Sequence, residues 1–168
     1  TFECDGGGVL ITQAIHTLDI MLLLCGPVKE VHGMVHTSSF HQLEAEDFSG
    51  ALLNFESGAR GTLMASTTHF PGHKEEIILN CSEATVNISG ADLKVFYHNG
   101  KIENLETDSQ TGSGSDPMDF SYTWHANVIK QFWTQFTKNQ QIEISAESAL
   151  PVQRLIDAIV RSSKLEKK

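Results

Sequence analysis

Basic residues are scarce in this sequence, and long apolar runs are absent from it. Twelve Lys and Arg stand against 21 Asp and Glu, so the formal net charge of the 168-residue chain is -9. Nucleic acids and anionic membranes bind clustered Lys and Arg, so we expect neither as a partner. No apolar run approaches the roughly 20 residues that span a bilayer, and no signal-peptide pattern opens the chain. We therefore expect a soluble, cytoplasmic globular domain that handles small molecules.

The signature motifs of several enzyme classes are also missing. Three cysteines without CxxC spacing argue against a disulfide framework or a zinc knuckle. The eight histidines form no HxH or HExxH pattern, so we expect no metal site. No GxSxG motif is present, and no Cys stands beside a His, so nucleophilic catalysis lacks support. Gly6-Gly7-Gly8 precedes a predicted helix and could cradle a phosphate, but the GxGxxG fingerprint of dinucleotide binding is absent.

A helical period is present over about residues 8–25, and Gly26-Pro27 is a typical end for it. Thr12, His16 and Asp19 are spaced i, i+4 and i+7 and share a mostly polar stripe of this otherwise apolar helix. An imidazole there could accept a proton while a neighbour fixes its tautomer. It could equally be a buried structural histidine, with Asp19 bonded to a nearby loop. Spacing alone leaves both interpretations open.

After Pro27 the apolar period changes to two, which predicts strands. The predicted strands are residues 28–37, 47–55, 60–68, 75–80, 84–88, 93–98 and 101–105. Short links, among them a tight turn at residues 56–59, favour antiparallel pairing. Residues 106–119 are predicted to form an exposed loop. Two helices follow, over about residues 120–139 and from near Ser145, where Pro151 means that the second helix either starts later or kinks.

These elements predict an α+β fold: an open, mainly antiparallel sheet of six or seven strands with helices packed on one face, all in one domain over residues 1–168. The strands carry apolar residues on both parities, such as Phe48 and Leu52 against Leu53 and Phe55. A sheet face that no helix covers is a typical protein–protein surface. We therefore expect a homodimer or tetramer that forms through the sheet face.

Blocks of sequence along the chain occur in the order of a known family. The first blocks are residues 6–10 (GGGVL), 14–19 (AIHTLD) and 26–28 (GPV). Later blocks are Glu46-Asp47, residues 55–62 and 65–67, Trp124-His125 with Phe132, and residues 155–159 and 161–163. Together they resemble the C-terminal domain of the Gfo/Idh/MocA oxidoreductases, which include glucose–fructose oxidoreductase and inositol dehydrogenase. The resemblance spans nearly the whole chain.

The resemblance implies a function shared between two domains. In this family an N-terminal Rossmann domain binds NAD or NADP, and an α+β domain carries much of the substrate pocket and the oligomer interface. Hydride passes between the nicotinamide and a secondary alcohol, usually of a sugar or cyclitol. A Lys of a Glu-Lys-Pro motif in the Rossmann domain and a His on the first helix of the second domain assist proton transfer, and that His falls on His16.

The resemblance also predicts what this chain leaves out. It contains neither the dinucleotide fingerprint nor the Glu-Lys-Pro Lys, and it opens on Thr1. We therefore expect the Rossmann domain to lie outside these residues and to hold most of the cofactor. The residues of this chain that contact the cofactor are unknown, and the isolated domain is expected to be inactive.

One departure from the family concerns Thr12, because many members have an Asp one turn before the His. A hydroxyl cannot take a proton at neutral pH. Thr12 would then position a substrate hydroxyl while His16 alone carries the proton, and Asp19 would bind substrate or support the structure. His69, Phe70 and His125 are further substrate-binding candidates, since they lie in segments that approach the substrate in relatives.

The sequence leaves two other functions open. The Thr in place of Asp also supports a non-catalytic binding or assembly module that has kept the fold and lost the chemistry. A metal-dependent hydrolase would require stoichiometric zinc or manganese, which the histidine spacing does not favour.

Overall fold

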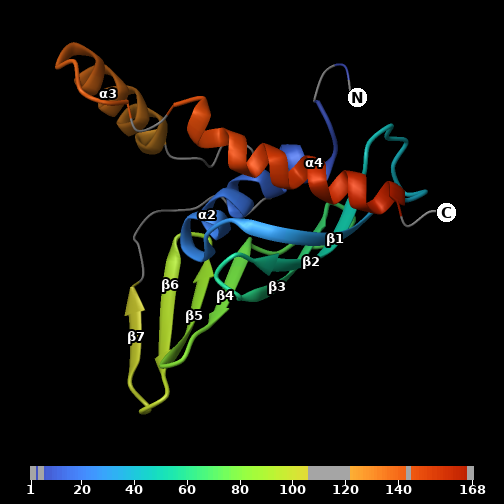
Figure 1. Ribbon diagram of the computed structural model, residues 1–168, viewed down its shortest axis with the longest axis horizontal. Helices are drawn as coiled ribbons and strands as arrows, with labels where there is room; N and C mark the ends of the chain where they lie inside the picture. Colours follow the sequence, from blue (N-terminus) through green and yellow to red (C-terminus); the bar gives the residue numbers. More distant parts are fainter. Residues whose placement is uncertain (1–2, 4–5, 106–121, 143–144, 166–168) are drawn as a thin grey trace. The chain divides into compact units, whose positions relative to one another are not determined.

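The computed structural model in Figure 1 describes residue 3 and residues 6–105, 122–142 and 145–165. Its contacts divide the chain into two units, one made of Thr1–Phe70 with Ala146–Lys168 and the other of Pro71–Ser145. The second unit is thus inserted into the sequence of the first. The loop predicted over residues 106–119 lies outside the described residues, as does the predicted start of the following helix at Phe120.

The first unit begins with a helix whose opening turn is π-helical. Leu10–Ala14 form η1, and Ile15–Cys25 form α2. The helix ends where the sequence predicts. Gly26 has a φ of 83°, and its N–H donates to the Leu22 carbonyl at 2.9 Å. A glycine adopts this backbone conformation without the strain that a Cβ would bring.

Three antiparallel strands follow, and they pair in chain order. They are β1 (Val28–His36), β2 (Phe48–Phe55) and β3 (Arg60–Ser66). Alternate residues of β2 face the core, as expected of a half-buried strand; the buried ones are Ser49, Ala51, Leu53 and Phe55. The predicted turn at residues 56–59 joins β2 to β3, and Gly58 has a φ of 88° there.

The last helix covers β1 and fills the core of the first unit. The short turn η2 (Glu147–Ala149) leads into α4 (Leu150–Leu165), so this helix starts later than Ser145 and holds Pro151 in its first turn. Proline is tolerated there because the first amides of a helix have no intrahelical acceptor. The buried face of α4 consists of Val152, Leu155, Ile156 and Ile159. These side chains pack with the first helix and β2, and α4 runs alongside β1 (Figure 1).

Side chains of α4 also bind the edge of β1 that faces away from β2. The N–H of Gly33 donates to the Ser162 hydroxyl at 2.9 Å, and the N–H of Val35 donates to the Ser163 hydroxyl at 3.0 Å. The close approach requires glycine, because a Cβ on Gly33 would lie 2.6 Å from the carbonyl oxygen of Ile159. The helix therefore closes a strand edge that could otherwise pair with another chain.

The second unit contains a four-stranded antiparallel sheet and the helix α3 (Thr123–Thr137). The strands pair in chain order and are β4 (Glu76–Asn80), β5 (Ala84–Ser89), β6 (Asp92–Tyr97) and β7 (Ile102–Leu105). No helix in the described ranges is both long and apolar enough to cross a bilayer.

The predicted α+β class, with open antiparallel pairing and helices on one sheet face, is confirmed. All seven predicted strands are present, and hydrogen bonding divides them into a sheet of three and a sheet of four. The helices α2 and α4 pack on the inner face of the first sheet, and the core of this unit lies between them and that face.

Candidate active site

Thr12, His16 and Asp19 lie on the exposed face of the first helix. The opposite face is buried through Leu10, Ala14 and Leu18. Within the described parts of the chain, the side chains of His16 and Asp19 make no hydrogen bond or ion pair. The interpretation of His16 as a buried structural histidine is therefore wrong. The same geometry provides no described neighbour that fixes the imidazole tautomer.

The hydroxyl of Thr12 is already engaged by the backbone. It donates to the Gly8 carbonyl at 2.9 Å, and the N–H of Thr12 donates to the same oxygen at 3.0 Å. The hydroxyl proton is thus used within the chain, while the lone pairs of the oxygen remain available. Thr12 can accept a hydrogen bond from a ligand hydroxyl, and it sits in a π-helical turn, a feature that often marks functional sites.

Glu46 occupies the N-terminus of this helix. Its backbone carbonyl accepts the N–H of Val9 at 2.8 Å, and its carboxylate oxygen Oε1 accepts the N–H of Leu10 at 3.2 Å. A Cβ on Gly8 would lie 1.9 Å from the Glu46 carbonyl oxygen, so glycine is required at that position. The run Gly6-Gly7-Gly8 therefore admits Glu46, whose carboxylate takes the place that a phosphate would need.

The next residue, Asp47, organises the loop between β1 and β2. Its buried carboxylate accepts hydrogen bonds from the hydroxyl and the N–H of Ser38, and His41 Nδ1 lies 3.1 Å from its Oδ2. These bonds, the Ser38 hydroxyl first, hold the pKa of Asp47 below its ordinary value, although desolvation opposes them. Ser38 and His41 bind the same carboxylate oxygen, so the histidine does not activate the serine as a nucleophile.

The other three predicted site residues are exposed and lie elsewhere in the chain. His69 and Phe70 follow β3 at the end of the first segment of unit one, outside the core that holds the helix of His16. His125 lies in α3 and belongs to the second unit. The structure thus brings Thr12, His16 and Asp19 together on one helix face. Among the described residues, no three His, Cys, Asp or Glu side chains gather as metal ligands.

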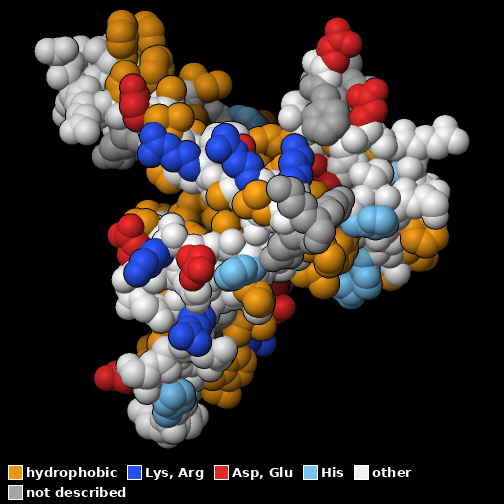
Figure 2. Space-filling view, turned by 45° about the vertical axis from the view of Figure 1, so that its right-hand side comes forward, with side chains coloured by type: hydrophobic (Ala, Val, Ile, Leu, Met, Phe, Trp, Pro, Cys, Tyr) orange, Lys and Arg blue, Asp and Glu red, His pale blue; other side chains and the backbone are white. Residues whose placement is uncertain are grey.

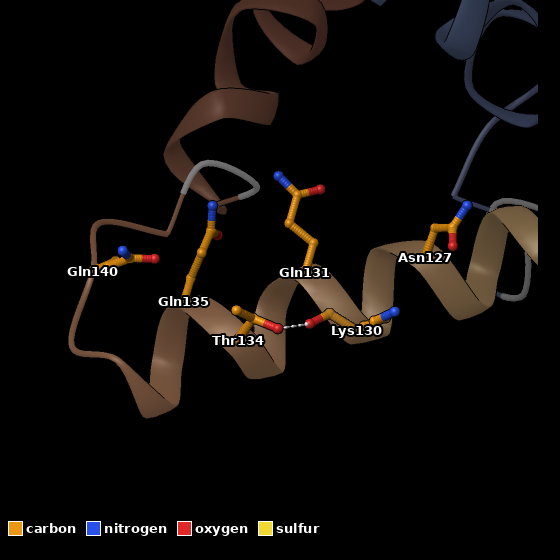
Figure 3. Close-up of a pocket in the computed structure, with 6 residues that line it drawn as sticks. All are labelled: Asn127, Lys130, Gln131, Thr134, Gln135 and Gln140. Atoms are coloured by element: carbon orange, nitrogen blue, oxygen red, sulfur yellow. Dashed lines mark hydrogen bonds between the residues drawn. The ribbon is translucent and has the colours of Figure 1, made fainter.

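A cavity of about 370 Å³ lies along α3 and contains none of the predicted site residues. It is lined by Asn127, Lys130, Gln131, Thr134, Gln135 and Gln140. Figure 3 shows these side chains, with the Thr134 hydroxyl donating to the Lys130 carbonyl at 2.7 Å. The six residues supply amide, hydroxyl and ammonium groups but no carboxylate or imidazole. The cavity therefore offers hydrogen bonds without a general base for neutral pH.

Sequence reasoning missed Glu46 as a structural partner of the glycine run. The two are 36 residues apart, and no local period connects them. The available signal was an acidic pair, Glu46-Asp47, placed directly before a strand whose alternate residues are apolar. Charges at such a boundary are costly to bury unless they are bonded, so they indicate a specific hydrogen-bonded role.

The fold is shared at low sequence identity with several solved proteins, two dehydrogenases and an oxidoreductase among them. WlbA dehydrogenase from Bordetella pertussis, solved with NADH and UDP-GlcNAcA, is 23% identical and has a TM-score of 0.70, covering 94% of this chain and 43% of its own. An oxidoreductase from Agrobacterium radiobacter, solved with NAD+, L-tartaric acid and magnesium, is 21% identical with a TM-score of 0.73; the match covers 93% of this chain and 47% of the other. Levoglucosan dehydrogenase, solved with NADH and levoglucosan, is 17% identical with a TM-score of 0.79, and the coverage is 99% and 50%. This chain thus spans half or less of the length of these three proteins.

The class defined by the fold is an α+β domain with helices on one face of an antiparallel sheet. The family profile described as the GFO/IDH/MocA C-terminal domain matches residues 2–87, which include the helix of His16 and all three strands of the first sheet. This chain belongs to that family. A comparison with curated protein sequences gives no significant match.

Proposed function

We propose that this chain is the substrate-binding domain of an NAD(P)-dependent oxidoreductase that acts on a secondary alcohol of a sugar or cyclitol. The observation that carries the proposal is the exposed imidazole of His16. It stands on a helix anchored by its opposite face, within the region that matches the family. A rigid helix with one outward imidazole is a suitable carrier for a general base.

In the proposed oxidation, His16 takes the proton of the substrate hydroxyl while hydride leaves the carbon that bears it, giving a ketone. The reverse reaction returns the proton from His16 to the oxygen. Thr12 accepts a hydrogen bond from a second substrate hydroxyl, since its own proton is held by Gly8. We assign Asp19 to substrate binding on the same face, and we retain His69, Phe70 and His125 as contacts to be tested.

Hydride transfer requires NAD or NADP, whose nicotinamide supplies the hydride acceptor when bound. The described residues of this chain do not fit the pyrophosphate of a dinucleotide, because Glu46 fills the one glycine-rich helix N-terminus. We therefore place the main cofactor site in a Rossmann domain outside these 168 residues, in a cytoplasmic protein. Tight NAD(P) binding by this chain alone, measured by calorimetry, would contradict that division.

The test of the activity is a His16→Ala substitution in the protein that joins this chain to its dinucleotide-binding domain. Loss of a general base lowers kcat by about 100-fold or more, while stability changes little because the side chain is exposed. Turnover is followed by NAD(P)H absorbance over a panel of sugars and cyclitols. His98→Ala, an exposed histidine on the second unit, is the matched control. Unchanged turnover of His16→Ala would remove His16 from the mechanism.

A non-catalytic binding or assembly module is the second candidate function, and Thr12 is the observation that favours it. A hydroxyl whose proton is held by Gly8 can position a ligand but cannot replace the Asp of many relatives as a proton acceptor. In that case the full-length protein would bind a sugar-like ligand, and no dinucleotide-dependent turnover would be found with any of the alcohols.

We further propose a homodimer or tetramer that forms through the outer face of the first sheet. Met34, Leu52 and Met64 lie on this face, opposite the helices, and their side chains are 55%, 60% and 79% exposed. Leu52→Glu is expected to raise the dimer dissociation constant at least about tenfold, because it places a charge in an apolar contact. Sedimentation measures the shift. Leu165→Glu, an exposed leucine at the end of α4, is the control, and a monomer at every concentration would contradict the proposal.

A further inference from the structure

Glu46 connects the loop before β2 to the helix that carries His16. Three contacts make this connection. The Glu46 carbonyl accepts the N–H of Val9 at 2.8 Å, Oε1 accepts the N–H of Leu10 at 3.2 Å, and the Glu46 backbone packs where a Cβ of Gly8 would lie. One residue therefore fixes both the chain path into the helix and two of its first amides, which lack intrahelical acceptors.

The contacts continue from Glu46 into the candidate site. Gly8, which is held against Glu46, accepts both the hydroxyl and the N–H of Thr12. Thr12 lies in the π-helical turn Leu10–Ala14, and His16 follows in the first turn of α2. A π-turn shifts the angular positions of the residues after it relative to an α-helix. The start of the helix therefore sets the directions in which Thr12 and His16 project.

Burial fixes the other side of the same turn. Leu10 is fully buried and its N–H is the donor to Glu46, so the side chain and the amide of one residue are held from two directions. The negative charge of Glu46 also lies at the positive end of the helix dipole, where it is favourable. The carboxylate thus stabilises this turn by both hydrogen bonding and charge.

We propose that Glu46 is a positioning residue that sets the geometry of Thr12 and His16 for proton transfer; this inference rests on the function proposed above. Glu46 does not touch the substrate. It holds Gly8 in place, so that the Thr12 hydroxyl donates to the Gly8 carbonyl and its acceptor lone pairs face outward. It also holds the helix in the π-helical register from which His16 projects.

The kinetic test is a double-mutant cycle in the full-length enzyme. Glu46→Ala is expected to lower kcat about tenfold in the wild-type background and less than about twofold in the His16→Ala background, since residues that act as a unit are non-additive. Glu46→Gln, whose amide oxygen can still accept the Leu10 N–H, is expected to recover most of the activity. Glu56→Ala, an exposed carboxylate in the β2–β3 turn, is the matched control. An equal loss in both backgrounds would assign Glu46 a purely structural role and overturn the proposal.

A second test uses this 168-residue chain and needs no activity. In amide hydrogen exchange and NMR spectra, Glu46→Ala is expected to increase exchange of the Leu10 amide about tenfold or more and to shift the Thr12 methyl and His16 ring resonances. Faster exchange at Leu10 with unchanged Thr12 and His16 resonances would overturn the positioning role. If the protein proves not to be a dehydrogenase, this measurement still decides whether Glu46 sets the geometry of the two side chains.

Discussion

The two units of this chain differ in how much apolar surface they bury. Among the residues that the structure describes, the first unit holds twelve of the thirteen buried hydrophobic side chains, and Ala84 is the one in the second unit. The apolar rows of the second sheet, such as Ile77, Ile88 and Leu93 across β4, β5 and β6, are half-buried. Hydrophobic side chains reach the molecular surface (Figure 2), and on α3 they include Ile129, Trp133 and Phe136, each more than 60% exposed.

The candidate site thus lies in the unit that buries more apolar surface. The helix of His16 is packed through Leu10, Ala14 and Leu18 into the best-buried part of the chain. A catalytic imidazole needs a support that does not move relative to its partners. The apolar faces of the second unit are only half-buried, so further packing against them would remove more apolar surface from water.

The largest effect expected from this comparison is on stability. Leu53→Ala, in the core of the first unit, is expected to lower the free energy of unfolding by about 3 kcal/mol, because it leaves a cavity beneath α4. Leu79→Ala, in the half-buried face of the second sheet, is expected to cost about 1 kcal/mol. Urea unfolding followed by circular dichroism measures both values. Equal costs would show that the two sheets are packed alike in solution.

A smaller effect is expected on the pH dependence of the unfolding free energy. It concerns two carboxylates, one in each unit, whose pKa values are both lowered. Asp47 is held by Ser38 and His41, and its side chain is fully buried. Glu103 is held first by Lys101 and then by Tyr97, whose own pKa it raises, and its side chain is 41% exposed. Solvent and salt screen the exposed carboxylate more strongly.

The sign of the pH dependence follows from the lowered pKa values. The folded chain binds fewer protons than the unfolded chain near the ordinary aspartate pKa of about 3.9, so this stability is complete above that pH and is lost as pH falls through the folded pKa. Asp47→Asn is expected to flatten the fall in unfolding free energy between about pH 5 and pH 2. Glu103→Gln is expected to flatten it less, and least at high salt. Urea midpoints across this pH range measure both slopes, and a steeper effect of Glu103→Gln would reverse the comparison.

Local patterns predicted most of the secondary structure. The strands follow from period-two alternation, and the turns follow from glycines such as Gly58 and Gly100, whose positive φ values are backbone requirements that the sequence records directly. Pro151 left two possibilities that the structure decides in favour of a later helix start. The stripe of Thr12, His16 and Asp19 was also predicted, because helical spacing fixes which residues share a face.

Contacts between distant segments could not be predicted. The bond from Leu10 to Glu46 spans 36 residues, and the bond from Gly33 to Ser162 spans 129. The sequence around the glycine run at residues 6–8 and around Gly33 does not indicate which distant atom approaches these glycines. The division of the seven strands into two sheets could not be predicted for the same reason, because alternation identifies a strand but not the strand it pairs with. The exposure of His16 likewise depends on which face of the helix the rest of the chain covers.

The hydrogen bonds between β1 and α4 make folding depend on the order of synthesis. Ser163 is made 128 residues after Val35, and the whole second unit is made in between. At usual translation rates this interval is on the order of ten seconds. During that time the amides of Gly33 and Val35 have no serine to bind, and Leu53 has no α4 above it. A nascent chain of this protein therefore carries an open strand edge until α4 emerges, and that interval is when pairing with a neighbouring chain competes with folding.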